Sequence, residues 1–419
     1  REALLLRARS SRLGAVNHRL PSAPSAASRL PRGYQQHLHP ATFSTPSPSS
    51  SLASRNLTTT LFSMASSAST PTSTSASVDP QQQPQRSVNL LVVAGPDSPE
   101  LSVLKQLPSA VQVVAVGRNS ADFAHLSESQ WRSVNVLLNC GVGKNAGKRD
   151  DIRALWPLLP SLTWMHSASA GLEHLLFPEL VEGPVVLTNA KGVYSHSLAE
   201  FALTACNWFA KDLPRLRRQQ AACQWEPYDV EELRGKTMGI IGYGDIGQAV
   251  GRLAKAFRMR VVALRRRVEL TEEERAAGVV DQLFPPSQLP ALMATSDYVV
   301  AATPLTPATA RMVDATAIAA MKPSGVFINV GRGGCVEEEA LVEALQSGRI
   351  RGAALDVFAV EPLPPTSPLW HLDNVLLSPH CADRTKEFQY ESLSFFLDNM
   401  RRFLAGQPLT NVCDKRSGY

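Results

Sequence analysis

Short runs of apolar residues alternate with segments of helix length from Ser87 onward. Four of these runs predict the strands of a first sheet: 88–94, 111–116, 134–139 and 162–166. An apolar run of strand length, bounded by turn residues and followed by a helical segment, is typical of the βα units of a parallel sheet. We therefore expect residues 87–192 to form an open α/β domain.

The pattern changes near Ser195, where apolar residues at helical spacing predict a long helix with Ser197 and Glu200 as its capping box. Its apolar face consists of Leu198, Phe201, Ala202, Ala205 and Phe209. Six further apolar runs predict a second parallel sheet within residues 193–383: 237–242, 261–264, 298–302, 326–330, 353–357 and 375–378. A last helix is predicted over 386–404. We expect residues 384–419 to return to the first domain, which is then discontinuous.

Charge and composition narrow the class of protein. The net charge of +5 is concentrated in residues 1–86, which carry nine Arg and two acids, so the rest of the chain is close to neutral. No basic patch favours a nucleic-acid partner, and no apolar run reaches the roughly 18 to 20 residues of a membrane span. The six Cys have neither CxxC nor Cys/His spacing. We expect no disulfide framework, no metal site and a reducing compartment.

The first 86 residues are rich in Ser, Ala, Pro, Thr and Arg and contain no Lys. This composition is typical of a transit peptide, which predicts import into a chloroplast or mitochondrion. The alternative is a disordered tail that carries no targeting signal, in which case we expect a cytoplasmic protein. Met64, which opens the segment MASSAST, is an alternative translation start.

A glycine motif marks the beginning of the second domain. Residues 238–251 read MGIIGYGDIGQAVG, an apolar strand that runs into GxGxxG and then into a helix. Gly242 permits the tight turn, Gly244 lets the backbone approach a pyrophosphate, and Gly247 allows the helix to pack closely on the strand. The amides of Asp245 and Ile246, at the start of the helix, are predicted to bind the phosphates. The alternative is that these glycines only form a turn and bind no ligand.

Three consecutive arginines follow the next strand. An enzyme specific for NAD places an Asp or Glu about 20 residues after the glycine motif, whereas this chain has Arg265, Arg266 and Arg267. Guanidinium groups bind a 2′-phosphate through charge-assisted hydrogen bonds. We therefore predict NADP(H) as the preferred cofactor, with NAD(H) possible. The alternative is a solvated surface run of arginines.

Five successive motifs carry a family resemblance: GKTMGIIGYGDIGQAVGRLAKAF, ATPLTPATARMV, MKPSGVFINVGRGGCVEEEALVEAL, GAALDVFAVEPLP and LLSPH. In order and spacing they resemble the D-isomer-specific 2-hydroxyacid dehydrogenases, and the branch of glyoxylate and hydroxypyruvate reductases most of all. The resemblance covers about residues 88–411. It implies a Rossmann-type NAD(P)-binding domain inserted within a flavodoxin-like substrate domain, and a homodimer packed through the cofactor domain.

Three residues are the candidates for catalysis. Arg332 follows an apolar strand and so lies at its carboxyl end, where its planar fork suits the carboxylate and carbonyl oxygens of a 2-oxo acid. A structural salt bridge is the alternative. The resemblance implies that His380 is the general acid and base, and that Glu361 orients the imidazole and favours its charged form. It also implies hydride transfer from NADPH to a small 2-oxo acid, without a metal.

The resemblance assigns further residues to ligands. The amides of Ala170 and Gly171, in SAGLEH, are expected to bind the substrate carboxylate. Asp356 is expected to contact the nicotinamide carboxamide, with Thr303 and Val330 beside the cofactor. A plain turn is the alternative for the first loop, and a cap or turn for Asp356 and Thr303. The sequence leaves open which 2-oxo acid is the substrate and in which direction the reaction runs.

Two other interpretations remain open. A corepressor or scaffold of the same fold also binds a dinucleotide and can retain the catalytic residues. A related class that oxidises formate pairs its His with Gln, so Glu361 argues against it.

Cys335 and Cys381 lie close to Arg332 and His380 in the sequence. This raises the hypothesis that thiol oxidation regulates activity; the alternative is that both are small apolar residues.

Overall fold

The computed structural model describes residues 87–140 and 149–418. The predicted leader over residues 1–86 lies outside these, so the transit-peptide interpretation stays a prediction. Within the described residues the strands form two sheets, and every pair of neighbouring strands is parallel. In these parts of the chain no helix has the length and apolar character needed to cross a membrane.

The first sheet has five strands in the order β2-β1-β3-β4-β5. This is the 2-1-3-4-5 order of flavodoxin-like folds. Its strands are β1 (Val88–Val93), β2 (Val111–Gly117), β3 (Val136–Asn139), β4 (Trp164–Ser167) and β5 (Val186–Asn189). The helices and 3-10 turns of this region are η1 (Pro99–Gln106), α1 (Glu128–Ser133), α2 (Arg149–Leu155), η3 (Trp156–Leu158), α3 (Pro178–Glu182) and the last helix, α11 (Phe388–Leu404).

The second sheet has seven strands in the order β12-β11-β10-β9-β6-β7-β8. Counted from β6, this is the Rossmann order 3-2-1-4-5-6 with one more strand at an edge. The strands are β6 (Thr237–Ile241), β7 (Arg260–Leu264), β8 (Gln282–Phe284), β9 (Tyr298–Ala301), β10 (Val326–Asn329), β11 (Gly352–Leu355) and β12 (Val375–Leu377). The order reverses between β6 and β9, the position at which open α/β sheets bind their ligands.

The remaining helices and 3-10 turns belong to this second region. They are α4 (Ser195–Ala210), α5 (Leu213–Ala221), α6 (Asp245–Ala256), α7 (Glu272–Ala277), η4 (Pro286–Gln288), α8 (Leu289–Thr295), α9 (Ala315–Ala320), η5 (Gly333–Cys335), α10 (Glu338–Gln346) and η6 (Pro368–His371). The predicted fold class, two open parallel α/β domains, is confirmed. All ten predicted strands are present with ends shifted by at most two residues, and the short strands β5 and β8 were not predicted.

The second sheet is buried on both faces, because successive side chains of a strand point in opposite directions. Ile240 and Val300 belong to the cluster that includes the apolar face of α4 and α6, whereas Ile241 and Val299 pack with α8, α9 and α10 on the other side. All four side chains are buried. Burial of such a side chain contributes about 1.5–3 kcal/mol, which makes the sheet a firm base for the loops at its ends.

The long helix predicted near Ser195 is α4, but its predicted capping box is wrong. The helix begins at Ser195 after Tyr194, so Ser197 already lies inside the first turn. Its hydroxyl donates instead to the carbonyl of Ala382 at 2.6 Å, and no side chain caps the helix. Ser197 thus ties α4 to the segment that follows β12.

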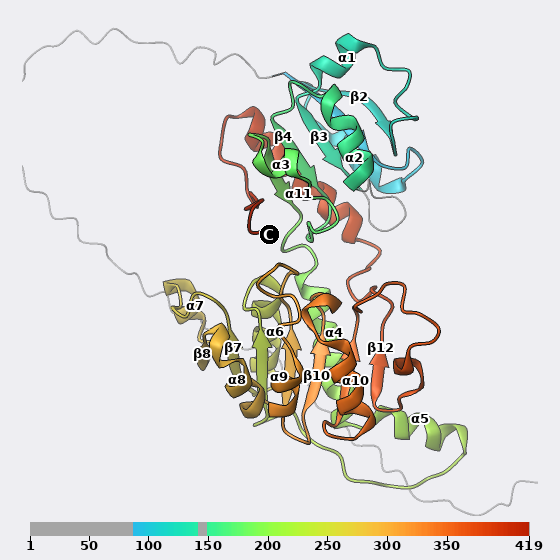
Figure 1. Ribbon diagram of the computed structural model, residues 1–419, viewed down its shortest axis with the longest axis vertical. Coiled ribbons are helices and arrows are strands. Elements are labelled where there is room, and N and C mark those ends of the chain that lie inside the picture. Colours follow the sequence, from blue (N-terminus) through green and yellow to red (C-terminus); the bar gives the residue numbers. More distant parts are fainter. Residues whose placement is uncertain (1–86, 141–148, 419) are drawn as a thin grey trace, which may run out of the picture. The chain divides into compact units, whose positions relative to one another are not determined.

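The last helix, α11, packs against the first sheet although residues 190–387 separate it from β5 along the chain. Leu393, Phe396 and Met400 are buried with Leu138 and Trp164, and the rings of Phe396 and Trp164 stack at 5.3 Å. Figure 1 shows α11 beside β3 and β4. The domain boundaries after residues 192 and 383 stay predictions.

Candidate active site

The predicted cofactor and catalytic residues gather at the carboxyl ends of the strands of the second sheet. Because the strands are parallel, all these ends lie on one edge of the sheet, where ligands bind. Gly242 follows β6, Arg265–Arg267 follow β7, Thr303 follows β9, Val330 and Arg332 follow β10, Asp356 and Glu361 follow β11, and His380 follows β12. The predicted substrate loop, with Ala170 and Gly171, follows β4 of the first sheet.

His380 and Glu361 form an ion pair at the end of β12. His380 Nδ1 lies 2.7 Å from Glu361 Oε2, and Glu361 Oε1 accepts a hydrogen bond from the Phe358 amide at 2.9 Å. The hydrogen bond with Glu361 raises the pKa of His380 above its ordinary value, while burial and Arg332 oppose the rise. Burial favours the neutral form of Glu361, but the bonds from His380 and Phe358 outweigh it and lower the pKa of that carboxyl group. The pair therefore favours the protonated imidazole.

The loop that carries His380 is fixed by Asp356, whose side chain is buried. One carboxylate oxygen, Oδ1, accepts hydrogen bonds from the Ser378 hydroxyl at 2.6 Å and from the amides of Cys381 and Ala382 at 2.9 and 3.1 Å. The His380 amide donates to the Asp356 carbonyl at 2.9 Å. His380 has a left-handed backbone conformation with φ of 52°. Such a conformation is uncommon for residues other than glycine and persists only where surrounding contacts hold it.

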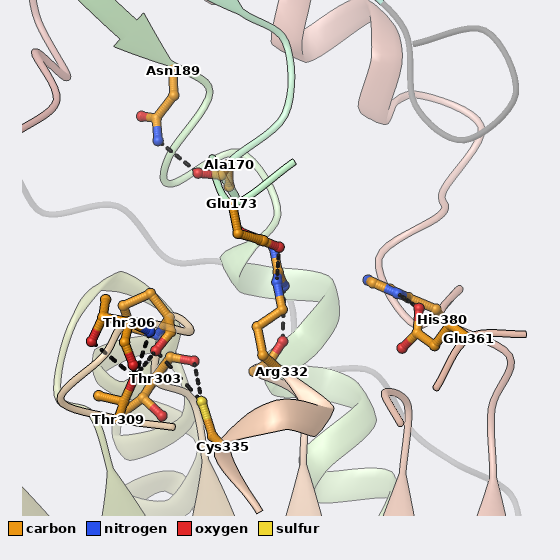
Figure 2. A network of polar contacts seen from close by, with 12 residues as sticks. Ala170, Glu173, Asn189, Thr303, Thr306, Thr309, Arg332, Cys335, Glu361 and His380 are labelled. Carbon is orange, nitrogen blue, oxygen red and sulfur yellow. Dashed lines mark hydrogen bonds and ion pairs between the residues drawn. The ribbon is translucent and has the colours of Figure 1, made fainter. Parts of the chain in front are cut away.

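Arg332 pairs with Glu173, a residue that the sequence analysis did not assign. Arg332 Nε donates to Glu173 Oε1 at 2.5 Å, and Nη1 donates to the carbonyl of Gly331 at 2.8 Å. Asn329 shapes this turn by accepting from the Gly331 amide at 3.1 Å and donating to the Arg332 carbonyl at 3.2 Å. Figure 2 shows the Arg332–Glu173 and His380–Glu361 pairs as two separate groups.

Gly171 lies directly against the Arg332 guanidinium. A Cβ atom at position 171 would lie 1.9 Å from Arg332 Nη2 and 2.9 Å from Glu173 Oε2, so only glycine fits there. Asn189 donates from Nδ2 to the carbonyl of Ala170 at 2.7 Å, which fixes the loop. Within the described residues the amides of Ala170 and Gly171 donate no hydrogen bond. The loop thus brings two backbone donors to the position of Arg332.

The neighbours of Glu173 keep it charged. Burial favours its neutral form, but the charge and hydrogen bond of Arg332 lower its pKa below the ordinary value. Arg149 Nη2 donates to the Glu173 carbonyl at 2.5 Å. Burial lowers the pKa of the adjacent His174, with Arg332 and Arg149 acting in the same direction and Glu173 against it. One anionic and two cationic side chains therefore meet at this loop.

The glycine motif has the geometry of a dinucleotide turn. Gly242 has φ of 95°, and a Cβ there would lie 2.8 Å from a Thr303 methyl group. A Cβ at Gly247 would lie 2.2 Å from the Gly242 carbonyl oxygen, so helix α6 packs closely on the turn. A Cβ at Gly244 would meet nothing within 4 Å, which leaves open space beside the start of α6. The amides of Asp245 and Ile246 begin this 12-residue helix and have no intrahelical acceptor.

Arg265 differs from Arg267. Its guanidinium makes four hydrogen bonds, two to the Glu274 carboxylate at 2.6 and 2.7 Å and one each to the carbonyls of Arg267 and Glu269. Its side chain is 12% exposed, whereas that of Arg267 is 63% exposed and lies 3.9 Å from Glu274. The bond from Arg265 is the main cause that lowers the pKa of Glu274 to about 2. Arg265 thus holds the loop together and has little donor capacity left for a phosphate.

The loop after β9 carries Thr303 and is held by its own threonines. Thr309 Oγ1 donates to the Pro304 carbonyl at 2.7 Å and accepts from the Thr306 amide at 2.8 Å (Figure 2). The Cys335 thiol lies against this loop, 3.5 Å from the Pro304 carbonyl. Cys335 is buried, and burial raises the pKa of its thiol. Oxidation requires an accessible thiolate, so this environment disfavours the redox hypothesis at Cys335; Cys381 is exposed, and there it stays a prediction.

In the described parts of the chain, no group of three or more His, Cys, Asp or Glu side chains is arranged to hold a metal ion. Two residues of the site were missed from the sequence, Glu173 and Ser378. Both stand next to motif residues, and a charged side chain two positions after Gly171 is the signal that would have identified Glu173.

The profile described as "D-isomer specific 2-hydroxyacid dehydrogenase, NAD binding domain" matches residues 203–382. Glyoxylate/hydroxypyruvate reductase B of Pectobacterium carotovorum is 34% identical over 259 residues, 60% of this chain and 79% of the relative. The chain belongs to the D-isomer specific 2-hydroxyacid dehydrogenase family. Members of this family are NAD(P)-dependent oxidoreductases that act on CH–OH groups. The matches to D-3-phosphoglycerate dehydrogenases span less than half of those relatives.

Solved structures of the family agree with this assignment. A D-isomer specific 2-hydroxyacid dehydrogenase from Xanthobacter autotrophicus, in complex with NADPH and MES, is 30% identical with a TM-score of 0.66 and covers 80% of this chain and 100% of its own. An NADPH-dependent glyoxylate/hydroxypyruvate reductase from Sinorhizobium meliloti, in complex with NADP and sulfate, is 27% identical with a TM-score of 0.65. It covers 79% of this chain and 100% of its own.

Proposed function

We propose that the protein is an NADPH-dependent reductase of small 2-oxo acids of the glyoxylate and hydroxypyruvate type, with His380 as its general acid and base. The observation that carries this proposal is the 2.7 Å pairing of His380 Nδ1 with Glu361 Oε2. It keeps a proton on the imidazole and leaves Nε2 as the ring atom for a substrate oxygen. The similarity to proteins named glyoxylate and hydroxypyruvate reductases supports this substrate class.

The turn after β6 fits a dinucleotide. The positive φ of Gly242, the close packing at Gly247 and the open space beside Gly244 are what a bound pyrophosphate requires. The amides of Asp245 and Ile246 would bind the phosphates, and Thr303, Val330 and Asp356 lie at the ends of the adjoining strands. A nicotinamide cofactor bound there supplies the hydride for the carbonyl carbon.

Arg266 and Arg267 are the residues that we assign to the 2′-phosphate of NADP(H). Arg265 is engaged with Glu274 and shapes the loop on which the other two stand. The loop has no carboxylate ahead of Glu269 to repel the phosphate, and Glu274 is neutralised by Arg265. This arrangement favours NADPH over NADH.

The chain's own residues account for the rest of the reaction. Arg332, with the amides of Ala170 and Gly171, binds the carboxylate of the 2-oxo acid and polarises its carbonyl group. His380 donates its proton from Nε2 to the carbonyl oxygen as the alkoxide charge develops there, and takes the proton back in the reverse direction. Glu361 stabilises the imidazolium, and Asp356 holds the His380 loop in its left-handed conformation.

The test is the initial rate of NADPH oxidation by the full chain with glyoxylate and with hydroxypyruvate, beside an NADH series and the variant His380→Ala. We expect turnover that requires His380 and prefers NADPH. Equal efficiency with NADH would remove the cofactor assignment. Binding of NADPH without turnover of either acid would reject this reductase and favour a scaffold of the same fold.

We also propose that the protein is a homodimer. Three apolar side chains are exposed on α5 and the segment that follows it: Leu216 is 45%, Val230 53% and Trp225 96% exposed. A second copy that packs on this segment would remove them from water, and apolar surface of this kind marks interaction sites. A molar mass of one chain by light scattering would reject the dimer.

A further inference from the structure

The Arg332 guanidinium already has a carboxylate partner inside the protein. Glu173 Oε1 accepts the Arg332 Nε hydrogen at 2.5 Å, and Nη1 donates to the Gly331 carbonyl. A guanidinium has five N–H groups, so these bonds leave donors on Nη1 and Nη2. Nη2 lies against Gly171, and the guanidinium occupies the space that a Cβ at this position would need. A substrate carboxylate that binds these donors shares the guanidinium with Glu173.

The second oxygen of Glu173 lies at the same place. A Cβ at Gly171 would lie 1.9 Å from Arg332 Nη2 and 2.9 Å from Glu173 Oε2, so Nη2 and this oxygen both lie against Gly171. The side chain of Glu173 is 35% exposed and that of Arg332 28%, so the pair is only partly screened by water. A substrate group that extends past the carboxylate meets a negative charge.

The other charged groups near the Glu173–Arg332 pair do not neutralise the carboxylate of Glu173. Arg149 contacts the backbone carbonyl of Glu173 rather than its carboxylate, and burial disfavours the charged form of His174. Glu361, paired with His380, adds another anion close enough for Arg332 to lower its pKa. Arg332 thus acts on two carboxylates, Glu173 by a direct ion pair and Glu361 through its charge.

We propose that Glu173 is a specificity-determining residue, an internal carboxylate that restricts the Arg332 site to 2-oxo acids with a single negative charge. This inference rests on the proposed function, because it takes Arg332 as the residue that binds substrate. It defines the substrate class as small monocarboxylic 2-oxo acids and excludes those with a second carboxylate or a phosphate group near the reacting carbon. A hydroxyl at that position is compatible, since it can donate to Glu173 Oε2.

The experiment compares the full chain with its Glu173→Gln variant, both loaded with NADP⁺, by calorimetric titration with oxamate and with oxalate. These ligands have nearly the same shape but carry one and two negative charges. Glutamine keeps an oxygen that can accept from Arg332 Nε and removes only the charge. We expect the affinity for oxalate to rise relative to that for oxamate by roughly fivefold, the size of one interaction between partly screened charges a few ångströms apart.

The matched control is Glu179→Gln, which removes the same charge from another Glu–Arg pair, with Arg153 at 2.7 Å on the surface. It is expected to leave the ratio of the two affinities unchanged. In steady-state assays, Glu173→Gln is expected to lower the KM for oxaloacetate more than that for glyoxylate. A purely structural Glu173 would instead change both KM values in the same direction and to the same extent, which would overturn the proposal.

The design separates this inference from the proposed function. Turnover of glyoxylate with an unchanged oxamate-to-oxalate ratio would refute the role of Glu173 alone. A changed ratio without any turnover would refute the reductase and leave the anion selectivity standing. If Glu173→Gln does not fold, judged by its thermal unfolding, Glu173→Asp serves instead. It keeps the charge but withdraws it by one methylene, so a smaller shift toward oxalate is expected, and no shift would count against the proposal.

Discussion

The site contains two carboxylates with similar surroundings and different partners. Glu361 bonds to His380 at 2.7 Å and Glu173 bonds to Arg332 at 2.5 Å, and the carboxylates are about equally exposed at 34% and 35%. An imidazole can release its proton near neutral pH, whereas a guanidinium cannot. We propose that the first pair controls where a proton resides and that the second controls which anion can bind. In this proposal the same acid residue serves catalysis in one pair and selection in the other because its partner differs.

Replacement of His380 should have the largest effect on activity, because it removes the proposed proton donor from the His380–Glu361 pair. We expect His380→Ala to lower kcat for glyoxylate reduction by roughly 10³-fold, the contribution of a positioned general acid, while KM changes much less because Arg332 remains. Steady-state kinetics at saturating NADPH measure both constants. His371→Ala, an exposed histidine on η6, is the control and should have wild-type rates. A kcat that survives in His380→Ala would mean that the proton comes from another donor.

A third pair, between Glu274 and Arg265, extends the comparison because we assign it to the loop that binds the cofactor and not to the substrate. We expect the double variant Arg266→Gln, Arg267→Gln to raise KM for NADPH by roughly thirtyfold through the loss of two charge-assisted bonds, and to leave KM for NADH nearly unchanged. Arg265→Gln should weaken both cofactors alike, since it loosens the loop rather than a phosphate contact. Kinetics with each cofactor distinguish the two patterns. A selective loss of NADPH binding in Arg265→Gln would contradict our division of roles.

Removal of the charge of Glu361 should change a pH profile more than a rate. Glu361 raises the pKa of His380. In the proposed mechanism reduction requires protonated His380, so we expect activity to be present below this pKa and to be lost as the pH rises through it. Glu361→Gln removes the main cause of the rise. The alkaline fall in kcat/KM for glyoxylate should therefore begin at lower pH, with a loss of about tenfold on that limb.

The control for this change is Glu173→Gln, whose partner cannot release a proton. Its profile for glyoxylate should fall at the same pH as that of the wild type. If both variants shift the profile equally, the two pairs do not have the separate roles that we assign to them.

The two pairs also differ in how much of each was predictable from the sequence. His380 and Glu361 are 19 residues apart, and motifs with family spacing identified both. The contact between Arg332 and Glu173 spans 159 residues and joins loops from two sheets, which no local pattern indicates. Position at a strand end predicted that Arg332 would face a ligand, but its partner depends on how the loop after β4 turns. Gly171 was assigned for its amide, and the structure adds that its missing side chain makes room for Arg332.

The predictions from local sequence were wrong or incomplete where contacts with distant parts of the chain determine the structure. The Ser197 capping box was wrong because the helix starts earlier and Ser197 bonds to Ala382 instead. The strands β5 and β8 were missed because they are only 4 and 3 residues long and are defined by pairing with β4 and β7 rather than by their own pattern. Arg265 was grouped with its two neighbours because a run of identical residues does not show which one meets Glu274.

The smallest expected effect is that of Ser378, which helps to hold the loop of the His380–Glu361 pair. Ser378 donates to Asp356 Oδ1 at 2.6 Å, the same oxygen that accepts the Cys381 and Ala382 amides. Ser378→Ala removes one of three bonds and leaves the carboxylate satisfied by the other two, so we expect the free energy of unfolding to fall by about 1.5 kcal/mol. Because the His380 loop then loses one anchor, kcat should fall about threefold without a shift of the pH profile. Urea unfolding and steady-state kinetics measure these changes, with Ser394→Ala, an exposed serine on α11 whose hydroxyl donates to the Tyr390 carbonyl, as the control. A shift of the profile as large as that of Glu361→Gln would show that Asp356 and Ser378 tune the proton on His380 as well as the position of its loop.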